Sequence, residues 1–222
     1  MGKELNVPWD DGNLTALLDE AESPDAFLIL AHGSGAGKDH DFMSGFARAV
    51  AQKGISVLRF NFPYMDAGKK FPDRGPVAIT VWKRVREWVG SNLSGELAVF
   101  TAGKSFGGRV AAMAAAEGMA TRSLIFLGYP LHPPKKEDKL RDKHLYPLQV
   151  PMLFLEGTRD PFANPEIMTR VVSGLNQDSE LVWFEGADHS FKVARSGRTG
   201  SEDGAGLAEA TADFIRRQLA KD

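Results

Sequence analysis

Short runs of hydrophobic residues recur along the chain, and segments with a different, helical spacing of hydrophobic residues separate them. The runs lie at residues 27–30, 55–60, 97–100, 124–127, 152–155 and 181–184. A run without alternating polar positions is typical of a strand that is covered on both faces, as in a parallel sheet. We therefore predict a buried strand at each run.

The segments that separate or follow these runs carry hydrophobic residues three or four positions apart, which indicates amphipathic helices. They are marked by residues 42–50, 81–89, 109–117, 167–172 and 207–215. Before the fourth of them, Asn164-Pro165-Glu166 combines an N-cap residue, a proline suited to the first helical position and an acidic first turn. This alternation predicts an α/β fold, a mainly parallel doubly wound sheet with helices on both faces.

No internal repeat and no linker divides the chain, so residues 1–222 are expected to form a single domain. The segment 3–20 is compatible with a short hairpin that turns at Asp10-Asp11-Gly12. Two segments are irregular, 131–149 and 192–206. Both follow predicted strands, at the sheet edge where α/β folds place their functional sites.

Composition limits what the protein is expected to bind. A formal net charge of −2 gives no field that would attract nucleic acid or an anionic membrane. The absence of cysteine excludes disulfides, a thiol nucleophile and thiolate metal ligands, and no H-E-x-x-H or other ligand cluster suggests a metal. We expect no cofactor, and with no signal peptide at the N-terminus we expect a cytoplasmic protein.

Ser105 is the candidate nucleophile. It lies in Gly103-Lys104-Ser105-Phe106-Gly107-Gly108, directly after a predicted strand and before a predicted helix. Glycines two positions on either side permit the sharp turn that raises a serine hydroxyl above a sheet. The sequence Gly103-Lys104-Ser105 also ends like a phosphate-binding loop, but Ala98 stands where that motif requires a glycine.

A serine needs a base, and the base needs an orienting acid. His189 follows the last predicted strand and is the predicted base. Asp160, in Gly-Thr-Arg-Asp-Pro after the preceding strand, is the predicted acid. Asp188 is a weaker alternative, because adjacent side chains on an extended loop tend to point apart.

Two backbone N–H groups are predicted to bind the oxyanion that forms when serine attacks a carbonyl group. Phe106 supplies the first, at the start of the helix that follows the nucleophile. Ser34 supplies the second, within His32-Gly33-Ser34-Gly35, where glycines allow the backbone to approach a ligand.

With these motifs the chain resembles the α/β-hydrolase superfamily, in its small lidless serine-hydrolase branch related to dienelactone hydrolases and bacterial esterases. Further matching segments, 59–64, 157–161 and 186–189, extend the resemblance over most of the chain. It implies the α/β-hydrolase fold, with Ser105 as nucleophile, Asp160 as acid and His189 as base. Serine stands here where dienelactone hydrolases typically use cysteine, so their substrate is not carried over.

The site is expected to be open, because only residues 129–149 lie where lipases and many esterases insert a helical cap. Side chains next to the predicted catalytic and strand-end positions are candidates to contact the substrate: Tyr64, Met65, Phe106, Leu131, Phe162 and Phe191.

The expected function is cleavage of a small ester or thioester through an acyl-enzyme intermediate. The alternatives are a catalytically silent protein that only binds or scaffolds, and an acyltransferase or lyase with the same triad. The natural substrate and the oligomeric state stay open.

Overall fold

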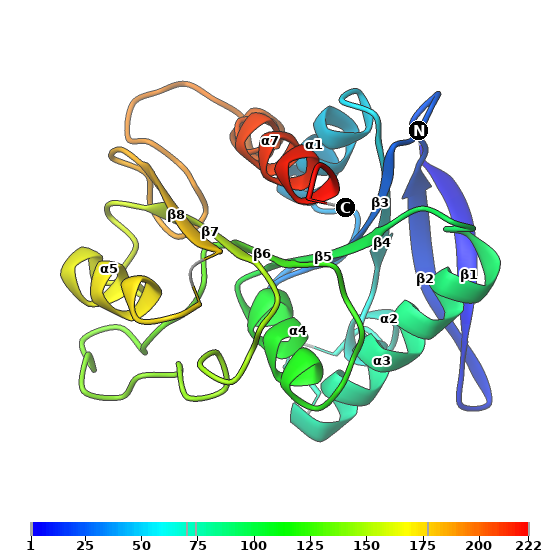
Figure 1. Cartoon of the computed structure of the whole chain (residues 1–222), viewed down its shortest axis with the longest axis horizontal. Helices are drawn as coiled ribbons and strands as arrows, with labels where there is room; N and C mark the ends of the chain where they lie inside the picture. Colours follow the sequence, from blue (N-terminus) through cyan, green and yellow to red (C-terminus); the bar gives the residue numbers. More distant parts are fainter. Residues whose placement is uncertain (1, 70, 74, 177, 222) are drawn as a thin grey trace.

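The computed structural model describes residues 2–69, 71–73, 75–176 and 178–221. Within them one sheet has eight strands in the order β1-β2-β4-β3-β5-β6-β7-β8 (Figure 1). The strands are β1 (Lys3–Trp9), β2 (Gly12–Asp19), β3 (Ala26–Ala31), β4 (Ile55–Phe60), β5 (Val99–Lys104), β6 (Leu124–Leu127), β7 (Met152–Gly157) and β8 (Ser179–Phe184). Strands β3 to β8 pair in parallel, and β1 and β2 form an antiparallel edge. The predicted mainly parallel α/β sheet is confirmed.

Helices cover both faces of the sheet (Figure 1). One face carries α1 (Asp41–Ala51), α6 (Gly200–Ala205) and α7 (Ala208–Leu219). The other carries α3 (Gly75–Asn92), α4 (Phe106–Ala116) and α5 (Pro165–Ser173), with the short α2 (Pro63–Asp66) beside them. No helix lies in residues 128–151 of the described chain, the segment where a cap would be inserted.

Burial on both faces explains why the central strands are hydrophobic without alternation. Every residue of β3 is buried. Phe27 and Ile29 pack into the core under α3 and α4, whereas Leu28 and Leu30 pack into the core under α1 and α7. Successive side chains of a strand point to opposite faces, so both sets must be apolar.

The β5–α4 junction and helix α6 differ from the sequence-based prediction. Strand β5 starts two residues later than expected and runs to Lys104, and α4 begins at Phe106, so Ser105 alone separates strand from helix. Helix α6 lies inside the segment expected to be irregular. It was missed because it carries almost no apolar side chains, and a capping box between Thr199 and Glu202 marks its start instead. The N-terminal hairpin is confirmed, with Trp9 opposite Gly12.

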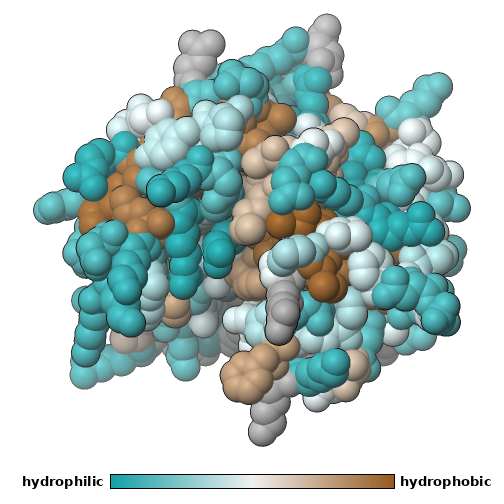
Figure 2. Space-filling model, turned by 90° about the horizontal axis from the view of Figure 1, so that it is seen from below, coloured by the Kyte–Doolittle hydropathy of each residue, from teal (hydrophilic) through white to brown (hydrophobic). Residues whose placement is uncertain are grey.

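The molecular surface is largely hydrophilic on the side of α3 and α4. Figure 2 shows this side, where brown hydrophobic atoms form broken patches between hydrophilic side chains.

In the described chain, no helix combines the length and the apolar character needed to cross a bilayer.

Helices α1 and α6 meet backbone to backbone, which gives a test of the packing. A methyl group at Gly204 would lie 2.1 Å from the Phe42 carbonyl oxygen, whereas one at Gly200 would make an ordinary contact at 3.5 Å. We expect Gly204→Ala to lower the free energy of unfolding by about 1–3 kcal/mol. Gly200→Ala in the same helix should leave it unchanged or raise it by up to about 1 kcal/mol. Urea unfolding of both variants checks this, and equal stabilities would contradict the packing argument.

Candidate active site

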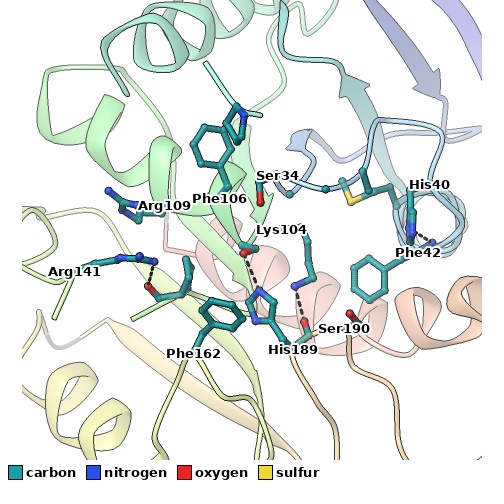
Figure 3. A pocket seen from close by; sticks show the side chains of 17 residues that line it. Ser34, His40, Phe42, Lys104, Phe106, Arg109, Arg141, Phe162, His189 and Ser190 are labelled. Atoms are coloured by element: carbon teal, nitrogen blue, oxygen red, sulfur yellow. Dashed lines mark hydrogen bonds between the residues drawn. The ribbon is translucent and has the colours of Figure 1, made fainter. Parts of the chain in front are cut away.

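Ser105, His189 and Asp160 meet at the edge formed by the carboxyl ends of the parallel strands. The Ser105 Oγ lies 2.8 Å from the His189 Nε2, and the His189 Nδ1 lies 2.5 Å from the Asp160 Oδ2 (Figure 3). The structure therefore brings together the three side chains that the sequence predicted. Asp188 does not reach the ring, because its Oδ1 accepts hydrogen bonds from the backbone N–H groups of Ser190 and Lys192.

The contact with Asp160 determines which ring nitrogen of His189 is free to act as a base. A carboxylate can only accept, so the Nδ1 carries the proton and the Nε2 accepts from the Ser105 hydroxyl. Burial lowers the pKa of His189, and the hydrogen bond to Asp160 opposes part of that shift. The ring is therefore neutral at pH 7, the state that a general base requires.

The turn at Ser105 is held by close backbone packing around it. Ser105 stands at φ 49° and ψ −113°, a conformation that non-glycine residues rarely adopt. A methyl group at Gly103 would lie 2.2 Å from the Gly108 nitrogen, and one at Gly107 would lie 2.5 Å from the His32 carbonyl oxygen. The flanking glycines are thus required because neighbouring backbone atoms pack closely against them. The residue with the left-handed conformation is Ser105 itself.

The loop of Ser34 is positioned by two side chains that sequence analysis did not single out for this role. The His32 Nδ1 lies 2.7 Å from the Gly33 oxygen, and the His32 Nε2 accepts from the Phe62 N–H at 3.1 Å. The Tyr64 hydroxyl donates to the Ser34 oxygen at 3.1 Å and approaches the Gly33 oxygen at 3.4 Å. In a planar trans peptide the Ser34 N–H points opposite to the Gly33 carbonyl group, so these contacts fix its direction.

A cavity of about 590 Å³ opens in front of Ser105. Ser34 and Phe106, the two predicted oxyanion donors, both lie in its wall. So does Phe162, whose ring lies 4.4 Å from that of His189, centroid to centroid. Arg109 and Arg141 also line the cavity, and sequence analysis missed both. Only the position of Arg109, four residues after the nucleophile, could have indicated this.

Four of the predicted substrate contacts lie elsewhere. Tyr64 and Leu131 are buried in the core, and the Tyr64 hydroxyl is turned to the Ser34 loop. Phe191 is also buried and stacks on Phe42 behind the cavity. Met65 packs against the core and is not among the residues that line the cavity. The prediction placed them by sequence neighbourhood, but the direction of each side chain depends on packing.

Lys104 ties the strand of the serine to the loop of the histidine. Its Nζ donates to the His189 carbonyl oxygen at 2.6 Å, and the rings of Phe42 and Phe191 flank it. Burial lowers the pKa of Lys104 to about 8, so it remains mostly charged at pH 7. The lysine of Gly103-Lys104-Ser105 therefore binds the backbone of the His189 loop, unlike the lysine of a phosphate-binding loop, which binds a ligand.

Glu156 is a second buried ionisable group near the site. It is on β7, and its Oε1 accepts from the Tyr129 N–H at 2.5 Å. Burial, together with the negative charge of Asp160, raises the pKa of Glu156 well above its usual value, which favours its neutral form. No group of three or more potential metal ligands occurs in the residues that the structure describes.

The fold and the motifs agree with one family of proteins. Residues 24–216 match the family model described as an alpha/beta hydrolase domain. Because this match covers most of the chain, the protein belongs to the α/β-hydrolase family. The resemblance inferred from the sequence motifs is confirmed.

Solved structures of other proteins have the same fold over nearly their whole length. An alpha-beta serine hydrolase homologue from Coxiella burnetii is 20% identical, with a TM-score of 0.75 over 97% of this chain and 96% of that chain. A serine hydrolase without a lid from Xanthomonas campestris is 23% identical, with a TM-score of 0.76 over 97% and 94%. A dienelactone hydrolase from Anabaena variabilis is 20% identical, with a TM-score of 0.74 over 98% and 97%.

His32 gives a test of the buried loop contacts. Burial lowers its pKa from 6.5 to about 4. As the pH falls from 6.5 to 4, the unfolded chain takes up a proton at this residue but the folded chain does not, so stability is lost. Over this range the free energy of unfolding should fall by about 3 kcal/mol more for the wild type than for His32→Asn. Denaturant unfolding at several pH values checks this, and a constant difference would contradict it.

Proposed function

We infer that the protein is a serine hydrolase that cleaves a small ester or thioester through an acyl-enzyme intermediate. The observation that carries this proposal is the continuous chain of contacts from Ser105 through His189 to Asp160, at 2.8 and 2.5 Å. The serine hydrolases among the similar structures support it, because they have the same fold.

The geometry supports a two-step mechanism. The Ser105 Oγ attacks the carbonyl carbon while the His189 Nε2 takes its proton, and Asp160 stabilises the imidazolium that forms. The N–H groups of Phe106 and Ser34 donate to the oxyanion, next to the positive end of α4. His189 then protonates the leaving alcohol or thiol, and water activated by the same histidine releases the acid.

The size and openness of the cavity favour small substrates over large ones. Its volume of about 590 Å³ lies within the range typical of small-molecule sites. The segment between β6 and β7, at 128–151, contains no helix that would close over Ser105. Substrates with a short acyl or alcohol part fit this site best.

Replacing the nucleophile tests the proposal directly. Ser105→Ala should abolish labelling by a fluorophosphonate and lower kcat on 4-nitrophenyl acetate by at least about 10³-fold. Ser190→Ala is the matched control, since Ser190 lines the same cavity and takes no part in the hydrogen bonds that join Ser105, His189 and Asp160. A Ser105→Ala protein that reacts as fast as the wild type would refute the assignment.

Lys104 gives a second test, through the pH profile. The acid limb of kcat/KM reports the pKa of His189 in the free enzyme, so its midpoint should lie below 6.5. The charge of Lys104 contributes to lowering that pKa. Lys104→Met should therefore move the acid limb to higher pH, and kcat should fall because the His189 loop loses its hydrogen bond.

The control for this test is Lys192→Met, which removes an exposed lysine from the same loop. It should leave the acid limb in place. An unchanged acid limb in a folded Lys104→Met protein would show that Lys104 does not act on the histidine.

A further inference from the structure

Two arginines stand in the wall of the cavity that contains Ser105. Arg109 belongs to the first turn of α4, and Arg141 to the segment between β6 and β7. Both are half-buried. In Figure 3 they lie on one side of the cavity, across from His40 and Phe42. Residues 32 positions apart in the chain are thus gathered on one wall.

No carboxylate of the described chain neutralises this pair. The residues that line the cavity include neither aspartate nor glutamate. Within the described residues, no ion pair shorter than 4.0 Å joins Arg109 or Arg141 to a carboxylate. Asp142, the acid next to Arg141 in sequence, instead accepts a hydrogen bond from the Tyr146 hydroxyl at 3.0 Å. The two positive charges therefore line the cavity without a carboxylate partner among the residues that the structure describes.

This arrangement is unfavourable in the empty protein. Partial burial lowers the pKa of Arg141, and the positive charge of Arg109 lowers it further, so the two guanidinium groups repel each other. Arg109 also stands at the N-terminal end of α4, where the helix dipole disfavours a cation. The two charges therefore do not stabilise the empty fold. An anion bound between them would offset both the repulsion between the guanidinium groups and the unfavourable position of Arg109 at the helix N-terminus.

Arg141 is held in place by its own backbone. Its N–H donates to the Leu131 oxygen at 2.8 Å, and its carbonyl oxygen accepts from the Tyr129 hydroxyl at 2.7 Å. Its guanidinium also approaches the Pro130 oxygen at 3.4 Å. Tyr129 is buried and its oxygen lies 2.9 Å from the His144 Nε2. These contacts hold Arg141 in a defined position, whereas a side chain on an open surface would be free to move.

We propose that Arg109 and Arg141 bind an oxyanion group of the substrate, so that the ester or thioester cleaved at Ser105 carries a carboxylate or phosphate. The planar guanidinium group donates two parallel hydrogen bonds to such a group and stays charged at all physiological pH values. This inference rests on the proposed hydrolase function and adds the chemical class of the substrate.

The test compares esters of similar size and shape, of which one carries an anionic group and the other does not. On the acyl side, mono(4-nitrophenyl) adipate and a phosphonate analogue of equal length are compared with 4-nitrophenyl hexanoate. On the alcohol side, 4-acetoxybenzoate and 4-acetoxyphenyl phosphate are compared with 4-methylphenyl acetate. The readout is the ratio of kcat/KM for each anionic ester to that for its neutral partner. We expect a ratio above about 10 in at least one series, and the carboxylate and phosphate arms identify the preferred anion.

Substitutions then assign this preference to the arginines. Arg109→Gln and Arg141→Gln should each lower the ratio by about 10- to 100-fold, the effect of losing a charged hydrogen bond. Arg170→Gln, which removes an exposed arginine on α5, should leave it unchanged. No preference in any series, or a preference that survives in the double variant, would overturn the inference.

A binding measurement separates this inference from the proposed function. In the Ser105→Ala background, monophenyl adipate or phenyl phosphate should raise the Tm, and Arg109→Gln with Arg141→Gln should abolish the rise. If neutral esters are cleaved through Ser105 but no anion preference or Tm rise is found, only the inference fails. If the anion raises the Tm through the arginines but Ser105 reacts with nothing, only the hydrolase function fails.

Discussion

The junction between β5 and α4 is the constraint on which the rest of the site depends. The strand ends at Lys104 and the helix starts at Phe106, so the chain must turn within one residue. Gly103 and Gly108 bring the two backbones into direct contact, and Ser105 takes the left-handed conformation that this contact imposes. Such a conformation costs on the order of 1–3 kcal/mol and persists only where the surroundings over-determine it. Here it directs the Oγ to His189, and the helix starts at Phe106 in the wall of the cavity.

The charges around this junction divide into a balanced set and an unbalanced set. Around the nucleophile, the positive charge of Lys104 interacts with the carboxylate of Asp160, while burial favours the neutral forms of His189 and Glu156. The buried groups therefore cancel, which limits the cost of burying charge. In the wall of the cavity, Arg109 and Arg141 have no such compensating carboxylate among the described residues. The compensated charges, on Lys104 and Asp160, therefore hold the site together. The uncompensated charges, on Arg109 and Arg141, are the ones that we propose bind a ligand.

The sequence was enough to predict the strands and the meeting of the three catalytic side chains, because local pattern and chain order determine both. Strands buried on both faces have an unmistakable hydrophobic pattern, and the carboxyl ends of parallel strands bring Ser105, Asp160 and His189 to one edge. Side-chain direction within loops depends instead on contacts between distant segments. Tyr64 turns to the Ser34 loop and Phe191 packs on Phe42, although both follow positions near the site. For the same reason no local pattern could identify Arg141.

The segment between β6 and β7 shows how an irregular sequence can still give a rigid wall. The His132 N–H donates to the Phe162 oxygen, and the His132 Nε2 accepts from the Asn164 N–H. These bonds join the segment to the loop of Asp160, whose carboxylate accepts from the Phe162 N–H. The wall that carries Arg141 and the turn that holds the acid are therefore one hydrogen-bonded unit. A protein without a cap must select its substrate with the wall alone, and this unit fixes that wall relative to the nucleophile.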